Sequence, residues 1–260
     1  MAYETIVYEK REGVAKITLN RPKTMNALER KLLDELSQAT KAVAQDDEVK
    51  AVIITGSGKA FCAGGDLNRF IEGFNLISGV DYVKAIHPWV LEWINLNKPT
   101  IAAVNGYATG AGLSLMLLCD ISLASENAKF SSAFVNMGLI PDLAATYYLP
   151  RVVGVQRAKE LFFTGRQVDS AEAYTIGLVN RVVPNEKLDE EAMALAARMS
   201  KGASFAIRST KKMVNLGLDL DLNSLLEAEA NIQGLCFGTE DCTEAVNAFL
   251  AKRNPIFKGK

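Results

Sequence analysis

The chain contains a single histidine, His87, and its four cysteines form no Cys-x-x-Cys pair. A zinc site built from cysteine and histidine needs several such ligands close together, so no metal site is expected. Ser114 has no second histidine to activate it and no Gly-x-Ser-x-Gly context, which argues against a serine hydrolase. No glycine-rich stretch fits Gly-x-x-x-x-Gly-Lys-Ser/Thr, which excludes a nucleotide P-loop.

A large excess of charge of one sign is also missing. The 260 residues carry a formal net charge of −1, with 49% hydrophobic and 23% charged residues. Scattered basic residues argue against nucleic acid as the main ligand. The apolar stretch 113–118 is too short to span a bilayer, so no membrane partner is expected. The first residues lack a basic segment followed by an apolar one, which predicts a cytoplasmic chain with reduced thiols.

Two glycine-rich stretches are the most informative feature that is present. Phe61-Cys62-Ala63-Gly64-Gly65-Asp66-Leu67 follows the apolar run 51–55, and residues 105–112 (Asn-Gly-Tyr-Ala-Thr-Gly-Ala-Gly) follow the apolar run 101–104. A strand, a loop of small residues and a helix together expose free backbone N–H groups. Two such loops could direct two donors at one oxygen, as an oxyanion hole does for an enolate. The alternative is that the glycines only make turns and close packing.

Apolar periodicity predicts an α/β fold with mainly parallel strands. The expected strands are 6–9, 14–19, 51–55, 101–104 and 121–124. The expected helices in this part are 29–45, a short one near 67–72, 82–96 with Pro88 near its start or kinking it, and 112–118; a mobile loop is expected over 74–80.

After about residue 153 the strand signals nearly vanish. Helices are expected over 158–163, 170–176, 188–199, 205–216, 222–235 and 240–252. We therefore expect a core with the active site over 1–195 and a helical C-terminal region over 196–260. The apolar faces of these helices could also pack against another subunit.

Asp142 is an isolated carboxylate in the apolar segment Leu-Ile-Pro-Asp-Leu-Ala-Ala. Between residues 98 and 150 there are two other acids, Asp120, which we interpret as structural, and Glu126, in a polar turn. Asp142 could be the N-cap of a helix that starts at Leu143. It could also be a general base, because apolar surroundings raise the pKa of a carboxyl group.

Two other polar residues have a structural and a functional interpretation. His87 lies between Ile86 and Pro88, where a lone histidine is usually a core or surface residue; a catalytic role is the alternative. Asp66 follows two glycines and could cap a helix.

The chain resembles the crotonase superfamily of enoyl-CoA hydratases and isomerases over nearly its whole length. The landmarks, in order, are Leu19-Asn20-Arg21-Pro22, Asn26-Ala27-Leu28, Phe61 to Leu67, Lys98-Pro99, Asn105 to Gly112, Cys119-Asp120, Gly138-Leu139-Ile140-Pro141, Gly177-Leu178-Val179 and Ala248 to Arg253. The resemblance implies a superhelix of ββα turns, a C-terminal helical region used in trimerisation, often a dimer of trimers, and acyl-CoA substrates.

The resemblance also implies the functional residues. The N–H groups of Gly65 and Ala111 would form the oxyanion hole. Backbone from Ala63 to Leu67, including Gly64 and Asp66, would contact coenzyme A, and Phe257 and Lys260 would reach the coenzyme A of a neighbouring subunit. We also expect Phe134 to line the pocket that binds the acyl group of the substrate. The substrate carries coenzyme A, and no separate cofactor is implied.

The departures from the family pattern concern the catalytic acids. Typical hydratases of the family have two glutamates where this chain has Ser114 and Phe134. Moving a double bond needs one group that takes a proton and returns it elsewhere, and Asp142 remains in the right segment. Its context is similar to the epoxyphenylacetyl-CoA isomerase and Δ3,Δ2-enoyl-CoA isomerase branch, in which this aspartate is the acid/base. In the 4-chlorobenzoyl-CoA dehalogenases a histidine and an aspartate align with His87 and Asp142.

We therefore expect an acyl-CoA isomerase that uses Asp142, Gly65 and Ala111. Three alternatives stay open: an enoyl-CoA hydratase, a dehalogenase-like hydrolase that also uses His87, and a non-catalytic acyl-CoA-binding subunit. Phe134 and the missing glutamates motivate the last of these.

Overall fold

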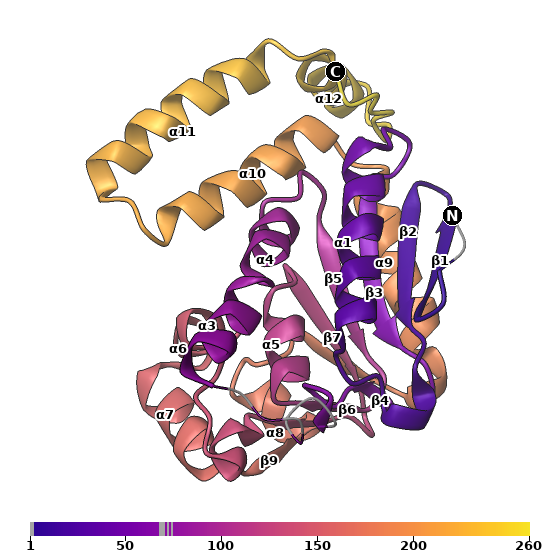
Figure 1. Cartoon of the computed structure of the whole chain (residues 1–260). Helices are drawn as coiled ribbons and strands as arrows, with labels where there is room; N and C mark the ends of the chain where they lie inside the picture. The colour runs from indigo at the N-terminus through magenta and orange to yellow at the C-terminus, as the bar shows by residue number, and fades with distance from the viewer. Residues whose placement is uncertain (1–2, 68–70, 72, 74) are drawn as a thin grey trace.

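The computed structural model describes residues 3–67, 71, 73 and 75–260 and shows a mixed α/β fold with two sheets (Figure 1). The larger sheet consists, in spatial order, of β1 (Ile6–Arg11), β2 (Val14–Leu19), β3 (Ala51–Gly56), β5 (Thr100–Val104), β7 (Ile121–Ser125) and β10 (Arg181–Val183). The smaller sheet consists of β4 (Ala60–Cys62), β6 (Tyr107–Thr109), β8 (Lys129–Ser131) and β9 (Gln167–Asp169).

Parallel pairing dominates, as the sequence predicts. β1 and β2 form an antiparallel hairpin, and β8 pairs antiparallel with β9; the other pairings are parallel. In both sheets the spatial order of the strands is also their order along the chain. Three strands of the larger sheet, β3, β5 and β7, are each followed by a short strand of the smaller one, β4, β6 and β8. β4 and β6 carry the chain into the two glycine-rich loops.

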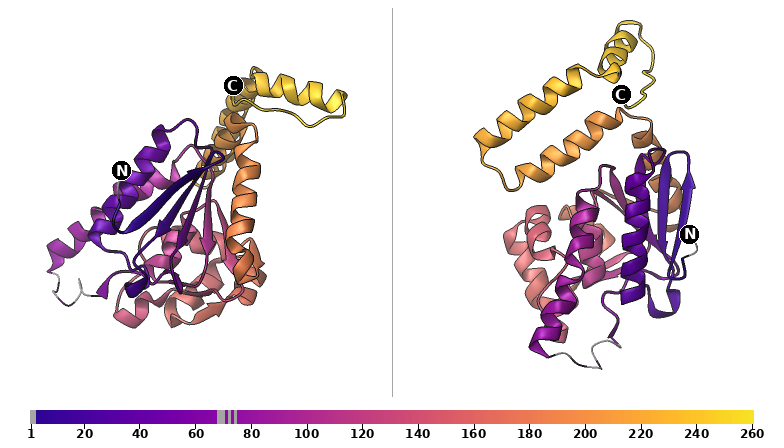
Figure 2. Two further views of the ribbon diagram at one scale, coloured as in Figure 1. Left: turned by 90° about the vertical axis from the view of Figure 1, so that its right-hand side faces the viewer. Right: turned by 45° about the horizontal axis from the view of Figure 1, so that its top comes forward.

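Helices cover both faces of the larger sheet. Val52 and Ile54 of β3 belong to the main core, on the side of α1 (Arg30–Gln45). Ile53 faces the opposite way and packs with Leu188 and other apolar residues of α9 (Leu188–Ser200). Figure 2 shows α1 and α9 on opposite sides of the strands. A strand buried on both faces reads as a continuous apolar run, which explains the sequence of β3.

The segment before β5 differs from the prediction of a loop followed by one long helix. It forms two helices, α3 (Leu76–Lys84) and α4 (His87–Ile94). The prediction of a loop over 74–80 is wrong from residue 76 on, because Asn75 and Ser78 form a capping box that starts α3. The Asn75 side chain accepts from the Ser78 N–H at 2.9 Å, and the Ser78 hydroxyl accepts from the Asn75 N–H at 3.0 Å. Pro88 lies in the first turn of α4, where its missing N–H costs no helical bond. The helix expected near 67–72 falls largely outside the described residues.

The helix expected over 112–118 is α5 (Ala111–Leu117), and α6 (Ala145–Val153) follows the Asp142 segment. After residue 153 the chain is mainly helical, as predicted: besides α9 it forms α7 (Val155–Thr164), α8 (Ser170–Thr175), α10 (Ser204–Gly217), α11 (Leu222–Phe237) and α12 (Glu240–Leu250). The 3₁₀ turns are η1 (Pro22–Thr24), η2 (Ala133–Met137) and η3 (Asn185–Lys187). The short strands β9 and β10 interrupt the C-terminal helices and were not expected. Both figures show α11 and α12 projecting from the body of the molecule (Figures 1 and 2). Among the described residues, no helix combines the length and the apolar character needed to cross a membrane.

Polar contacts attach α10 to the core. The Lys211 ammonium group pairs with the Asp120 carboxylate at 2.8 Å and donates to the Lys98 carbonyl at 3.0 Å. Asp120 also accepts from the N–H and hydroxyl of Thr100. The structural interpretation of Asp120 is therefore confirmed: it joins the start of β5 to α10.

Candidate active site

The first glycine-rich loop follows β4 and is fixed along one edge by the segment that precedes α1. The Ala63 N–H donates to the Met25 carbonyl at 3.0 Å, and the Leu28 N–H donates to the Gly64 carbonyl at 2.7 Å. The Asp66 N–H donates in turn to the Leu28 carbonyl at 3.0 Å. Because successive N–H groups of an extended chain alternate in direction, the N–H of Gly65 points away from Leu28. It has no acceptor among the described residues.

Side chains of the Asn-Arg-Pro and Asn-Ala-Leu motifs hold this edge in place. The Arg21 guanidinium group pairs with the Asp66 carboxylate at 3.1 Å and with the Glu29 carboxylate at 2.9 Å, and it donates to the Ala27 carbonyl at 2.6 Å. The buried Asn26 amide donates to the Ala60 carbonyl at 2.7 Å. Sequence reasoning quoted these residues as landmarks but missed this function: they position the loop that carries Gly65.

The second glycine-rich loop ends at the first turn of α5. Gly110 has φ 54° and ψ −123°, which a residue with a side chain rarely adopts, and its N–H donates to the Ser131 carbonyl at 2.8 Å. Ala111 is the first residue of α5, so its N–H has no acceptor within the helix. Within the described part of the chain that N–H is also without another acceptor.

The two loops touch each other through their glycines. A methyl group placed on Gly64 would lie 2.8 Å from the Thr109 carbonyl oxygen and 3.5 Å from the Ala111 nitrogen. One placed on Gly112 would lie 2.0 Å from the Cys62 carbonyl oxygen. Close packing is therefore one function of these glycines. The same packing brings Gly64, the neighbour of Gly65, next to the free N–H of Ala111.

Ser114 and Phe134 stand where the resemblance places the two glutamates of typical hydratases, and both side chains are buried. Ser114 is fully buried, and its hydroxyl donates to the Gly110 carbonyl of its own helix at 3.4 Å. Phe134 is buried in η2, and its ring lies 4.0 Å from where a methyl group on Gly110 would be. Neither position can supply an acid or a base.

Asp142 is half-buried, and its Oδ1 atom is buried without a hydrogen-bond partner in the described structure. Burial raises the pKa of this carboxyl group to about 6, which its own backbone N–H and the field of His87 oppose. The prediction that Asp142 caps a helix starting at Leu143 is wrong. The helix, α6, starts at Ala145, and its N-cap residue is Ala144, with no side-chain cap bond.

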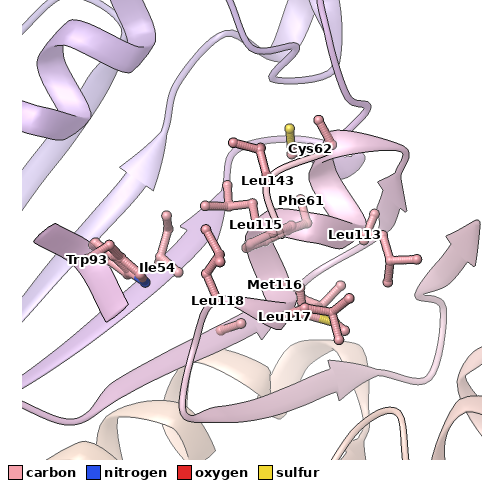
Figure 3. Close-up of a cluster of buried hydrophobic side chains, with 14 of the residues drawn as sticks. Ile54, Phe61, Cys62, Trp93, Leu113, Leu115, Met116, Leu117, Leu118 and Leu143 are labelled. Carbon is pink, nitrogen blue, oxygen red and sulfur yellow. The ribbon is translucent and has the colours of Figure 1, made fainter. Parts of the chain in front are cut away.

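The cap fails to form because Leu143 and Ala144 both have left-handed backbone conformations, with φ of 48° and 60°. For residues with a side chain, this conformation costs about 1–2 kcal/mol each. Leu143 is 7% exposed and belongs to the buried cluster that contains Cys62, Leu113 and Leu115 (Figure 3). Burying a leucine side chain stabilises by about 1.5–3 kcal/mol, which is enough to hold one such residue in place.

His87 is exposed in the first turn of α4, and its charge acts on Asp142. The structure thus brings the sole histidine and the isolated aspartate within electrostatic range, although they are far apart in sequence. No group of three or more histidine, cysteine, aspartate or glutamate side chains that could hold a metal ion occurs among the residues that the structure describes.

The expected coenzyme A contacts lie in two separate places. Ala63 to Leu67 belong to the first loop, where Leu67 is 57% exposed. The tail folds against its own α12 instead: Asp241 accepts from the N–H groups of Lys258 and Gly259 and donates its N–H to the Lys260 carbonyl at 3.1 Å. Figure 1 shows the C-terminus and the loops beside β4 and β6 at opposite ends of the molecule. Phe257 and Lys260 therefore do not join the site of their own chain.

A cavity of about 600 Å³ lies between α4, α6 and α10. Ala144, two residues from Asp142, lines it together with Leu91 and Ile94 of α4, while α10 contributes the basic side chains of Arg208 and Lys212. The space on this side of the Asp142 turn is therefore bounded by both the core and the helical C-terminal region.

Known proteins resemble the chain over its full length. The profile of the family described as Enoyl-CoA hydratase/isomerase matches residues 9–260. Identity to crotonyl-CoA hydratase of Syntrophomonas wolfei is 41% over 262 residues, with 100% of both chains covered, and identity to 1,2-epoxyphenylacetyl-CoA isomerase of Escherichia coli is 38% over 260 residues, with 99% of both covered. The crystal structure of enoyl-CoA hydratase from Bacillus anthracis matches with a TM-score of 0.94 at 36% identity, covering 99% of this chain and 100% of that one. These matches confirm the fold that the resemblance implies.

Proposed function

Because the chain belongs to the enoyl-CoA hydratase/isomerase family of enzymes, the crotonase superfamily, we propose that it is an acyl-CoA isomerase that moves a double bond of an enoyl-CoA thioester or rearranges a ring. One observation carries this choice. Asp142 is a half-buried carboxylate whose Oδ1 atom has no hydrogen-bond partner in the described structure, whereas Ser114 and Phe134 stand where the resemblance places the two glutamates of typical hydratases. One carboxylate is enough for a proton transfer from one carbon to another.

In the proposed reaction, the thioester oxygen accepts hydrogen bonds from the N–H groups of Gly65 and Ala111. Asp142 removes a proton from the carbon next to the carbonyl, and the two N–H groups stabilise the resulting dienolate. Asp142 then returns the proton to the far end of the former double bond. Loss of one such donor costs about 3 kcal/mol in comparable sites.

The pKa of Asp142 suits this cycle. At about 6, the group is mostly ionised at neutral pH and still basic enough to take a proton. The rate should therefore rise with pH up to about 6 and level off above it. No metal or redox step is part of this proposal, because the substrate already carries the coenzyme A thioester that acidifies the reacting carbon.

A hydratase is the second candidate, and the relatives favour it. The Syntrophomonas wolfei relative is a crotonyl-CoA hydratase and the Bacillus anthracis structure an enoyl-CoA hydratase, whereas the Escherichia coli relative is an isomerase. In a hydratase, Asp142 would hold and activate a water molecule. The third candidate is a dehalogenase-like hydrolase that uses both His87 and Asp142. The fourth is an inactive acyl-CoA-binding subunit.

The experiment that decides is a substrate screen read by liquid chromatography and mass spectrometry, because isomers of equal mass are separated by their retention times. Purified protein and the Asp142→Asn variant are incubated with 3-enoyl-, 2-enoyl- and aryl-CoA thioesters, including a chlorinated one. An isomerase converts 3-enoyl-CoA without a change in mass, whereas a hydratase adds one water to 2-enoyl-CoA. Halide release identifies the hydrolase. Binding without turnover of any thioester would refute an enzymatic function on these substrates.

We also propose that copies of the chain assemble into a trimer or a dimer of trimers, with residues 196–260 as the assembly region. The projecting helices expose large apolar side chains, among them Leu222, Leu235, Phe237, Phe249 and Leu250, each at least 60% exposed. Large exposed apolar side chains gathered on projecting helices are typical of interaction sites. Such an assembly could bring the tail of one subunit to the active site of another. The free cysteines fit a reducing compartment, and we propose the cytoplasm.

A further inference from the structure

Aspartate residues in front of other helices of this chain behave differently from Asp142. Asp169 and Asp221 have extended backbones directly before α8 and α11, and their carboxylates accept from the N–H groups of Glu172 and Ser224 at 2.9 and 3.1 Å. These are ordinary N-caps. The Ser224 hydroxyl and N–H both hold the pKa of Asp221 below its usual value.

At Asp142 the same spacing gives a different outcome. The N–H of Ala145, three residues on, donates to the Asp142 backbone carbonyl at 3.0 Å and not to its carboxylate. The Ala144 carbonyl then accepts from the N–H groups of Tyr147 and Tyr148, both at 3.0 Å, so Ala144, and not Asp142, is the N-cap residue of α6. The difference lies in the two left-handed residues, which replace the extended backbone of an ordinary cap.

We propose that Leu143 and Ala144 are positioning residues: their left-handed conformations keep the Asp142 carboxylate off the N-terminus of α6 and leave its buried Oδ1 atom without a hydrogen-bond partner in the described structure. The inference rests on the proposed role of Asp142 as the base. An aspartate paired with helix N–H groups would be a weak base, because those bonds stabilise its ionised form. The turn prevents this pairing at the expense of backbone strain.

Packing on both sides holds the turn in place. Leu143 inserts into the main core beside Cys62 and Leu115, and Ala145 is 1% exposed. Ala144 itself is half-buried. Because its side chain is a single methyl group, residue 144 can be changed without removing a large core side chain, which makes it the position to test.

Two substitutions at Ala144 test whether the left-handed backbone conformation of residue 144 controls the pKa of Asp142. Ala144→Gly favours the left-handed conformation, so we expect a higher melting temperature and an unchanged pH profile of kcat/KM. Ala144→Val disfavours it, because β-branched residues rarely adopt positive φ. We expect this variant to lose at least tenfold in kcat and to move the acid limb of its profile from about pH 6 towards the ordinary aspartate value of about 3.9.

His87 is the titratable side chain whose charge acts on Asp142 within the described residues. Since it is unchanged in both variants, repeating the profiles in a His87→Gln background removes its contribution equally from each. A folded Ala144→Val protein with the wild-type acid limb would overturn the inference, and so would an Ala144→Gly protein that melts no higher than wild type.

A direct titration covers the case in which Ala144→Val does not fold. Carbon NMR of the aspartate carboxyl groups, with Asp142→Asn to assign the signal, should show the wild-type group titrating near pH 6. Titration near pH 4 would mean that the carboxylate is paired and would overturn the inference. If the carboxyl group titrates as expected but Asp142→Asn keeps full activity, the positioning role stands and the proposed catalytic function fails.

Discussion

Replacing Asp142 with asparagine should abolish isomerisation while the chain stays folded. Asparagine has nearly the same size but cannot accept a proton from the substrate. General base catalysis contributes about 100-fold to 10,000-fold, so the variant should keep less than about 1% of the wild-type kcat. The Asp142 side chain makes no cap bond to α6, so the helix loses no such bond in the variant.

The same substitution should change how stability depends on pH. The folded-state pKa of Asp142 is raised to about 6, above the value of about 3.9 for an unfolded chain. The folded state therefore holds this proton more tightly. Its contribution to stability is fully present below about pH 4 and is lost as the pH rises through about 6. The raised pKa corresponds to about 3 kcal/mol of lost stability at neutral pH, of which about 2 kcal/mol is lost between about pH 4.5 and 7.5.

Asparagine does not ionise, so the variant should escape this loss. Urea unfolding of both proteins at the two pH values should show the variant gaining about 2 kcal/mol relative to wild type at the higher pH. Asp47→Asn, at an exposed position, is the matched control and should show no such gain. If Asp142→Asn keeps more than about a tenth of the wild-type rate, its activation free energy has risen by less than about 1.4 kcal/mol, and Asp142 is excluded as the base. A stability difference that does not vary with pH would refute the burial argument.

Three further experiments test the two glycine-rich loops and the assembly of subunits. Ala111→Pro removes one oxyanion donor and should lower kcat about 100-fold or more, with a thermal melt to confirm folding; full activity would exclude this N–H. Gly64→Ala forces a methyl group to within 2.8 Å of the Thr109 carbonyl oxygen and should impair turnover, whereas Gly138→Ala, also at positive φ but with no atom within 4 Å, should leave the rate nearly unchanged. Light scattering should give a mass at least three times 28.2 kDa, and a clean monomer at micromolar concentration would contradict the proposed trimer.

The long, strongly patterned elements of the fold could be predicted from the sequence. The strand expected over 51–55 is β3, because a continuous apolar run indicates a strand buried on both faces. The helix expected over 29–45 is α1, because its apolar residues recur at helical spacing. The short strands β4, β6, β8 and β9 could not be found this way. Three residues show no period, and these strands exist because they pair with partners far away in the sequence.

The site could be predicted in its composition but not in its local geometry. The two glycine-rich loops do meet, as expected, but the contact between Gly64 and Thr109 depends on tertiary packing. The failed cap at Asp142 had no signal in the sequence, because neither Leu143 nor Ala144 favours a left-handed conformation and no glycine marks the turn. The roles of Gly65, Ala111 and Asp142 in turnover stay predictions.

The order of the strands has a consequence for how the chain folds while it is being made. Each strand of both sheets lies beside the one synthesised before it in that sheet, so an emerging strand finds its partner already in place. No earlier pairing has to open to admit it. Ile53, Ile101 and Leu123, however, stay uncovered on one face until α9 leaves the ribosome. The nascent chain therefore carries an open apolar sheet through most of its synthesis, and that interval is when it is most exposed to aggregation or most in need of a chaperone.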